Sequence, residues 1–180
     1  PHIYQARVHA SKALNRVIPA GRQSGKTVLA VAEIGEWSMS APRRWPQDER
    51  PQFWWVTASY ETKAKAVRDI TAHLPKGIVA KYSEREAYWT LRNGSTITIR
   101  SADGKDSLVS ERLHGLVGDE CGDWGDAVYD QQLSAMTATT GGPQILMGIP
   151  RGMNWFHEKA MNQAQGVPGW ETFTWKTADS

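Results

Sequence analysis

The stretch Ala20-Gly21-Arg22-Gln23-Ser24-Gly25-Lys26-Thr27 decides how this 180-residue chain folds. An apolar run, residues 17–20, precedes it, and good helix formers follow it from residue 28 to residue 37. A strand, a glycine-bearing loop that ends in Gly-Lys-Thr and a helix form the phosphate-binding P-loop arrangement. Its loop amides and helix N-terminus present partial positive charge to one concave spot, which suits a polyphosphate.

Two side chains complete the predicted phosphate site. Lys26 places a full charge where β- and γ-phosphates would lie, and the hydroxyl of Thr27 can ligate Mg²⁺. The usual pattern has glycine where this chain has Ala20, and Arg22 adds a second cation inside the loop. Because alanine resists positive φ, we expect the turn at the loop base to differ. The alternative is an ordinary strand–turn–helix in which Gly-Lys-Thr occurs by chance.

The composition is that of a globular α/β domain. Hydrophobic residues make up 40% and charged residues 22%, and the formal net charge is +2, which is ordinary for a globular chain. This small charge permits contact with nucleic acid but does not argue for it. A single cysteine, Cys121, excludes an internal disulfide and fits a reducing compartment. No apolar run reaches the roughly 18 residues that would cross a membrane.

Strand-like and helix-like segments alternate along the chain. Hydrophobic periodicity predicts helices over residues 4–14, 26–39 and 60–73, with a further helix that ends near residue 165. It predicts strands over residues 16–20, 53–58, 113–118, 144–150 and 170–175. Residues 87–92 and 95–100 alternate around Asn93-Gly94, which is the strongest short hairpin signal. We therefore expect an α/β fold with a mostly parallel central sheet, helices on both faces and an inserted antiparallel hairpin.

Asp119 and Glu120 directly follow the apolar-leaning strand that begins at residue 113. This is the Walker B form, in which the aspartate holds Mg²⁺ and the glutamate orients or deprotonates the attacking water. A strand that ends in solvated acids is the alternative. The order along the chain, with the acid pair well after the phosphate loop, favours the functional interpretation. Gly115 and Gly118 weaken the strand signal.

Other polar residues allow two interpretations each. Gln5 offers the donor and acceptor that an adenine edge needs, but it could equally be a solvated helix residue. Asp123, Asp126 and Asp130 could ligate a metal, although acids at a helix N-terminus are the simpler explanation. The basic residues Lys63, Lys65 and Arg68 share one predicted helix, as a solvated face or as a track for a nucleic-acid backbone.

With these residues in place, nearly the whole chain resembles the ATPase domain of the large terminase subunit, the DNA-packaging motor of tailed bacteriophages. Residues 21–27 are similar to the terminase variant of the phosphate loop, in which an arginine sits inside the loop, and this accounts for Ala20. Residues 1–5 resemble the family's adenine motif, and residues 56–60 resemble a strand-end segment shared with helicase-like motors. Residues 148–156 resemble the coupling motif, which links hydrolysis to movement.

The resemblance implies a RecA/ASCE-like P-loop NTPase that hydrolyses ATP with Mg²⁺. The implied nucleotide-binding residues are Gln5, Gly21, Arg22, Gln23, Ser24, Gly25, Lys26 and Thr27. The implied metal ligands are Thr27 and Asp119, and the implied catalytic residues are Glu120, Lys26 and Arg22. The implied coupling residues are Gly148, Ile149, Pro150 and Arg151.

Two departures from the family pattern matter. Family members usually carry a hydroxyl pair before the proline, where this chain has Gly148 and Ile149, so a sensor hydroxyl is expected to be missing. The family often carries an arginine shortly before the Walker B strand that acts on a neighbour's nucleotide. Here that place reads Leu108-Val109-Ser110, with Arg112 nearby. Either Arg112 substitutes for the trans-acting arginine, or that arginine is absent.

The implied setting is the cytoplasm of a bacterial host, where the motor would move double-stranded DNA into a procapsid. The family implies portal and small-terminase partners and a homo-oligomeric ring, with a monomer in isolation as the alternative. We expect residues 1–180 to form a single ATPase domain, without the family's nuclease domain, and no membrane association. The rival hypotheses are a helicase- or repair-type DNA motor lobe and a non-hydrolysing nucleotide-binding assembly module.

Overall fold

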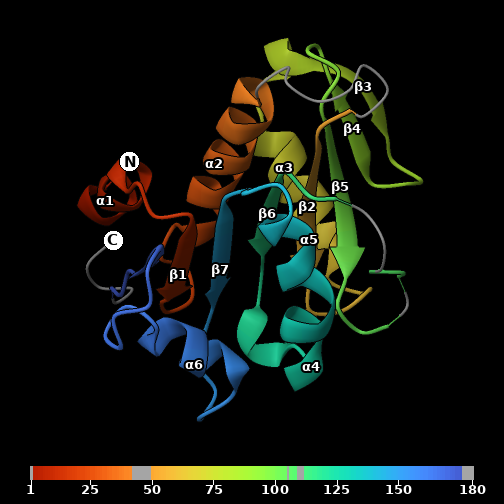
Figure 1. The fold of residues 1–180 in the computed structure, drawn as a ribbon. Coiled ribbons are helices and arrows are strands. Elements are labelled where there is room, and N and C mark those ends of the chain that lie inside the picture. The colour runs from red at the N-terminus through yellow and green to blue at the C-terminus, as the bar shows by residue number, and fades with distance from the viewer. Residues whose placement is uncertain (1, 42–49, 105, 109–111, 176–180) are drawn as a thin grey trace.

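The computed structural model describes residues 2–41, 50–104, 106–108 and 112–175, which form a three-layer α/β sandwich. Its eight-stranded sheet has the order β3-β4-β5-β2-β6-β7-β1-β8. The strands are β1 (Asn15–Pro19), β2 (Gln52–Thr57), β3 (Val79–Ser83), β4 (Tyr88–Leu91), β5 (Thr96–Ser101), β6 (Gly115–Gly118), β7 (Gln144–Gly148) and β8 (Trp170–Thr172). The predicted α/β fold with a mostly parallel sheet is thus confirmed (Figure 1).

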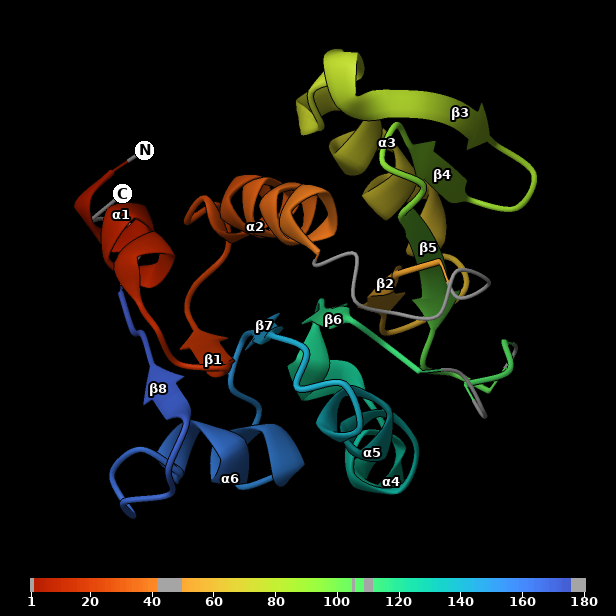
Figure 2. The same cartoon turned by 45° about the horizontal axis from the view of Figure 1, so that its top comes forward.

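Helices cover both faces of this sheet (Figure 2). The helices are α1 (Ile3–Ala10), α2 (Lys26–Ser40), α3 (Lys63–His73), α4 (Asp126–Val128), α5 (Ser134–Ala138) and α6 (Trp155–Met161). Short turns complete the list: the 3-10 turns η1 (Lys76–Ile78) and η2 (Cys121–Asp123) and the π-helical turn η3 (Tyr129–Leu133). Figure 2 shows α2 and α3 on one face and α4, α5 and α6 on the other. No helix among the described residues is both long and apolar enough to cross a membrane.

The side-chain alternation of the central strands divides the interior into two cores. Trp55 packs with α2 and α3, while its neighbour Trp54 packs with the aromatic residues of α6 and the helical stretch 126–138. Ile18 and Val17 divide between the two cores in the same way. Both faces of a parallel sheet are buried under helices, which is why these strands read as continuous apolar runs rather than as alternating ones.

The predicted hairpin is present, and it extends the main sheet. β4 and β5 pair antiparallel around Asn93-Gly94, whose glycine has φ +91°. β5 then pairs in parallel with β2, and β3 adds a further antiparallel partner for β4. The sequence pattern did not single out β3 as a strand, because its exposed Ala80 and Lys81 interrupt the apolar alternation.

The first helix is shorter than the predicted residues 4–14. It ends at Ala10, and Ser11 takes an extended conformation with ψ 141°. The Ser11 hydroxyl donates to Glu171 Oε2 at 2.6 Å and accepts from the Ala13 amide at 3.1 Å. Serine competes with helical hydrogen bonding in this way, and the chain is thereby turned into β1.

The glycines of β6 serve close packing. A β-carbon at Gly115 would lie 2.7 Å from Phe53 Cδ1 and 3.2 Å from Trp37 Cε3. A β-carbon at Gly118 would lie 2.7 Å from Cys121 Sγ and 2.9 Å from Trp124 Cη2. The residues that weakened the strand signal are therefore the ones that let large aromatic rings approach the centre of the sheet.

We predict that Gly115→Ala destabilises the domain by roughly 1–3 kcal/mol, because the added methyl group overpacks a full core. Urea unfolding followed by tryptophan fluorescence would measure this loss. Gly77→Ala is the matched control, since nothing lies within 4 Å of a β-carbon there. Equal stability of the two variants would contradict the packing role of Gly115.

Candidate nucleotide-binding site

Three parallel strands deliver the predicted site residues to one edge of the sheet. The phosphate loop follows β1, Asp119 follows β6 and Ile149 follows β7. β7 lies between the other two, with Gly148 beside Pro19 and Leu146 beside Gly118. Since ligands of open α/β sheets bind beyond the carboxyl ends of the strands, this edge is the expected place for a nucleotide.

The phosphate loop is held in shape by its own lysine. Lys26 Nζ donates to Ala20 O at 2.9 Å and to Ser24 Oγ at 3.2 Å, and it also bonds Gly21 O. Burial lowers the pKa of Lys26, partly offset by the negative charge of Asp119. Gly25, at the N-cap of α2, has φ +75°, and Gln23 has φ +52°. The left-handed turns that Ala20 cannot supply are thus made further along the loop.

Helix α1 and the last described residues clasp this loop. Gln5 Nε2 donates to Gly25 O at 3.0 Å, and Gln5 Oε1 accepts from the His2 amide at 3.0 Å. From the C-terminal part of the described chain, Trp175 Nε1 donates to Ser24 O at 3.0 Å, and its indole stacks on Tyr4 of α1. Gln5 therefore lies at the loop, as the adenine-motif resemblance requires, with its amide engaged by protein. Its contact with adenine stays a prediction.

The acid pair occupies a sharp turn at the end of β6. Glu120 has φ +55°, a left-handed conformation that costs a non-glycine residue of order 1–2 kcal/mol. Its amide donates to Asp119 Oδ1 at 3.0 Å, and Trp124 Nε1 donates to Asp119 O at 3.0 Å. The strand ends at Gly118, before both acids, and the left-handed turn at Glu120 lets each carboxylate have a direction of its own.

The pKa of Asp119 is raised to about 6, chiefly because the carboxylate is buried. The positive charge of Lys65 opposes this shift, the neighbouring Glu120 adds to it, and Lys26 opposes it weakly. A bound cation would stabilise the ionised form of this buried carboxylate. Asp119 and the hydroxyl of Thr27 are oxygen donors of the kind that Mg²⁺ prefers, and their joint role as metal ligands stays a prediction.

The coupling-motif residues lie directly against the acid turn. A β-carbon at Gly122 would meet Ile149 O at 2.3 Å, and one at Gly148 would meet Cys121 N at 3.0 Å. Arg151 Nε pairs with Asp123 Oδ1 at 2.6 Å. The close approach explains the missing hydroxyl at position 148, because a larger side chain would crowd the turn that carries Glu120.

Asn154 ties the same turn to α6. Its Nδ2 donates to Gly122 O at 3.1 Å, and its Oδ1 accepts from the His157 amide at 3.2 Å as the helix N-cap. Asp123, Asp126 and Asp130 do not gather around a metal. Asp123 pairs with Arg151, Asp126 opens α4, and Asp130 pairs with Lys159 Nζ at 2.7 Å.

Two residues remain. Arg112 was predicted for the site and lies away from the acid turn, whereas Lys65 was not predicted for the site and acts on it. Arg112 is exposed and precedes the amino end of β6, at the sheet edge opposite the phosphate loop. Its role as a trans-acting arginine stays a prediction. The sequence predicts Lys65 as part of a solvated face or of a nucleic-acid track, and the structure adds that its charge affects the pKa of both Lys26 and Asp119. Nothing in its local sequence signals this.

The fold and the site together define a P-loop ATPase-type domain. A family model described as "Terminase large subunit, T4likevirus-type, N-terminal" matches residues 17–167. The chain therefore belongs to the large terminase subunit family, and the resemblance seen in the sequence is confirmed.

Curated and solved relatives agree with this assignment. The large terminase subunits of Thermus phage G20c and Thermus virus P23-45 are each 24% identical over 177 residues, covering 88% of this chain and 35% of theirs. The chain thus spans about a third of the length of these relatives. The Thermus phage P74-26 large terminase ATPase domain has a TM-score of 0.81 at 21% identity, covering 97% of this chain and 80% of that one. At this identity, the structural likeness shows the RecA/ASCE-like fold.

We predict that Asn154→Ala destabilises the domain by roughly 1–2 kcal/mol, since it removes both a helix cap and the bond to Gly122. Asn154→Asp keeps the cap acceptor but loses the Nδ2 donor, and we expect it to recover the larger part of this loss. Chemical denaturation of the three proteins gives both values. An aspartate variant as unstable as the alanine variant would show that the tie to Gly122, and not the cap, dominates.

Proposed function

We propose that this chain is the ATP-hydrolysing domain of a packaging motor that moves double-stranded DNA into a viral procapsid. The observation that carries the proposal is the placement of the phosphate loop and the Asp119–Glu120 pair on the two sides of β7, at one edge of the sheet. A triphosphate bound at the loop would then extend toward the acid pair.

Each site residue has a separate proposed role in ATP hydrolysis. Thr27 and Asp119 would hold Mg²⁺, which when bound neutralises charge on the β- and γ-phosphates. Lys26 would give up its hydrogen bonds to the loop carbonyls and bond phosphate oxygens instead. Arg22 would add a second positive charge at the loop. Glu120 would accept a proton from the attacking water or orient it. Most of the rate enhancement would come from this positioning and charge stabilisation.

The contacts of the acid turn suggest how hydrolysis reaches the rest of the domain. Gly122 and Cys121 lie against the backbone of residues 148 and 149, and the Asp123–Arg151 pair and Asn154 continue the contact into α6. A shift of Glu120 upon phosphate release could not be absorbed by loose packing here, so it would move the β7–α6 connection. This is the coupling role proposed for Gly148, Ile149, Pro150 and Arg151.

The relatives support nucleotide as the ligand. The large terminase of a thermophilic bacteriophage, solved with ADP and with ATP-γ-S, has TM-scores of 0.75 and 0.73 to this chain. Double-stranded DNA, a portal, a small terminase subunit and a ring of identical subunits are the partners that this assignment implies, with Arg112 as the candidate trans-acting arginine. The host cytoplasm is the implied location.

A helicase-type motor is the alternative whose fold also resembles this chain. The UvsW helicase of bacteriophage T4 has a TM-score of 0.59 at 11% identity, which shows only the shared fold. Duplex DNA that stimulates ATP turnover without strand separation would favour the packaging motor. Strand separation would favour the helicase, and tight ATP binding without turnover, with or without DNA, would favour the assembly module.

We predict that Glu120→Gln binds ATP with near-normal affinity but loses turnover by at least about 100-fold, because general-base catalysis typically contributes 10²–10⁴. A fluorescent-nucleotide titration and a phosphate-release assay on the same preparation measure the two properties. Glu158→Gln, an exposed acid of α6, is the control and should retain turnover. Normal phosphate release by Glu120→Gln would remove Glu120 from the mechanism.

Asp119→Asn and Thr27→Val should each raise the Mg²⁺ concentration needed for half-maximal turnover, since each removes one proposed oxygen ligand. We expect a shift of about tenfold or more, by analogy with other changes at metal ligands. Magnesium titrations at saturating ATP would reveal it. An unchanged Mg²⁺ requirement in both variants would refute this ligand assignment.

A further inference from the structure

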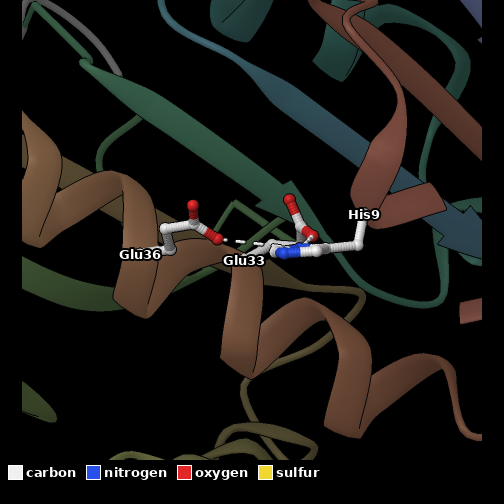
Figure 3. A group of neighbouring side chains, drawn as sticks. All are labelled: His9, Glu33 and Glu36. Atoms are coloured by element: carbon white, nitrogen blue, oxygen red, sulfur yellow. Dashed lines mark hydrogen bonds and ion pairs between the residues drawn. The ribbon is translucent and has the colours of Figure 1, made fainter. Parts of the chain in front are cut away.

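A second group of metal-ligating side chains lies away from the nucleotide site, where α1 packs beside α2 (Figure 3). His9 comes from α1, and Glu33 and Glu36 come from α2. One ligand atom from each residue lies within 4.8 Å of the others. Glu33 and Glu36 are three residues apart and so share one face of the helix.

The distances between these atoms are close to those of a coordination shell. His9 Nδ1 is 2.6 Å from Glu33 Oε1 and 3.6 Å from Glu36 Oε2. Two ligands of a tetrahedral Zn²⁺, each about 2.0–2.1 Å from the ion, lie about 3.3 Å apart. Small rotations of two exposed side chains would therefore suffice, because the side chains of His9 and Glu36 are each 56% exposed.

The third ligand is buried and already oriented. The side chain of Glu33 is 3% exposed, and its Oε2 accepts from Arg16 Nη1 at 2.8 Å. Arg16 is itself fixed, because it also donates to Val8 O at 3.1 Å and lies over the Trp37 ring at 5.0 Å. With Oε2 held by Arg16, Oε1 is turned toward His9. A partner that fixes a ligating carboxylate in this way is typical of metal sites.

We propose that His9, Glu33 and Glu36 form a binding site for a divalent transition metal of the zinc class, which pins α1 to α2. One imidazole nitrogen and two carboxylates suit Zn²⁺ or Co²⁺, with solvent at the open fourth position. Mg²⁺ and Ca²⁺ prefer oxygen ligands alone and fit less well. Without metal, the same residues form a histidine–glutamate hydrogen bond, which is the competing explanation.

The site has a consequence for the phosphate loop. α1 carries Gln5, whose amide holds Gly25 O. The metal would fix the far end of the same short helix to α2, the helix that the phosphate loop enters. Metal binding would therefore stabilise the contact between Gln5 and the phosphate loop, although the metal itself would not touch the nucleotide.

The test uses the nucleotide-free domain after treatment with a chelator. Co²⁺ titration followed by visible absorption, and Zn²⁺ titration followed by calorimetry, should show one equivalent bound. At about 100 times the dissociation constant, Zn²⁺ should raise the melting temperature by roughly 5–10 °C. His9→Ala and Glu36→Gln should each weaken binding at least about tenfold and remove this shift, measured against each variant's own metal-free melting temperature.

Two controls separate this site from others on the chain. His73→Ala removes an exposed histidine of α3 and should bind as the unmodified domain does. Asp119→Asn should also bind normally, since it alters only the acid turn. Unchanged Zn²⁺ affinity in both His9→Ala and Glu36→Gln would overturn the proposal, as would binding lost in Asp119→Asn or no binding at all. None of these outcomes depends on ATP turnover, so the proposed function can fail separately.

Discussion

The parallel pairing of β1, β7 and β6 is the constraint on which the rest of this structure depends. Each strand is short, and the register between them sets how far the phosphate loop lies from the acid turn. The helices that follow β1 and precede β7 pack on opposite faces and fill the two cores. Loss of this pairing would separate the phosphate loop from the Asp119–Glu120 turn, even if the individual helices kept their structure.

The glycines show how closely the parts of the site fit. Gly122 and Gly148 bring two backbone segments into contact, with the side chains of Arg151 and Phe156 beside them. A close-packed interior leaves no free space for a group to move into. A small displacement on one side of such a contact therefore moves the residues on the other side as well. The acid turn and the start of α6 are therefore packed as one unit.

Much of this organisation could be predicted from the residues, for identifiable reasons. The loop at Lys26 and the acid pair at Asp119 are local patterns, each marked by a few adjacent residues. The order of the strands was not predicted, because β7, which follows both β1 and β6 in the chain, lies between them in the sheet. The tie from Trp175 to Ser24 could not be predicted, because it joins residues 151 positions apart and has no local signature. The same holds for Lys65, whose influence on Asp119 arises only through the packing of α3 beside the sheet edge.

The Trp175–Ser24 bond also bears on where this domain can be cut. Both the first helix and the last described tryptophan hold carbonyl groups of the phosphate loop, while Tyr4 and Trp175 stack on each other. A fragment that stopped at residue 170 would keep every phosphate-loop residue, but it would lose the Trp175 hydrogen bond to Ser24 and the stacking of Trp175 on Tyr4. Tyr4 and Trp175, near the two ends of the described chain, are therefore part of the packing that supports the phosphate loop.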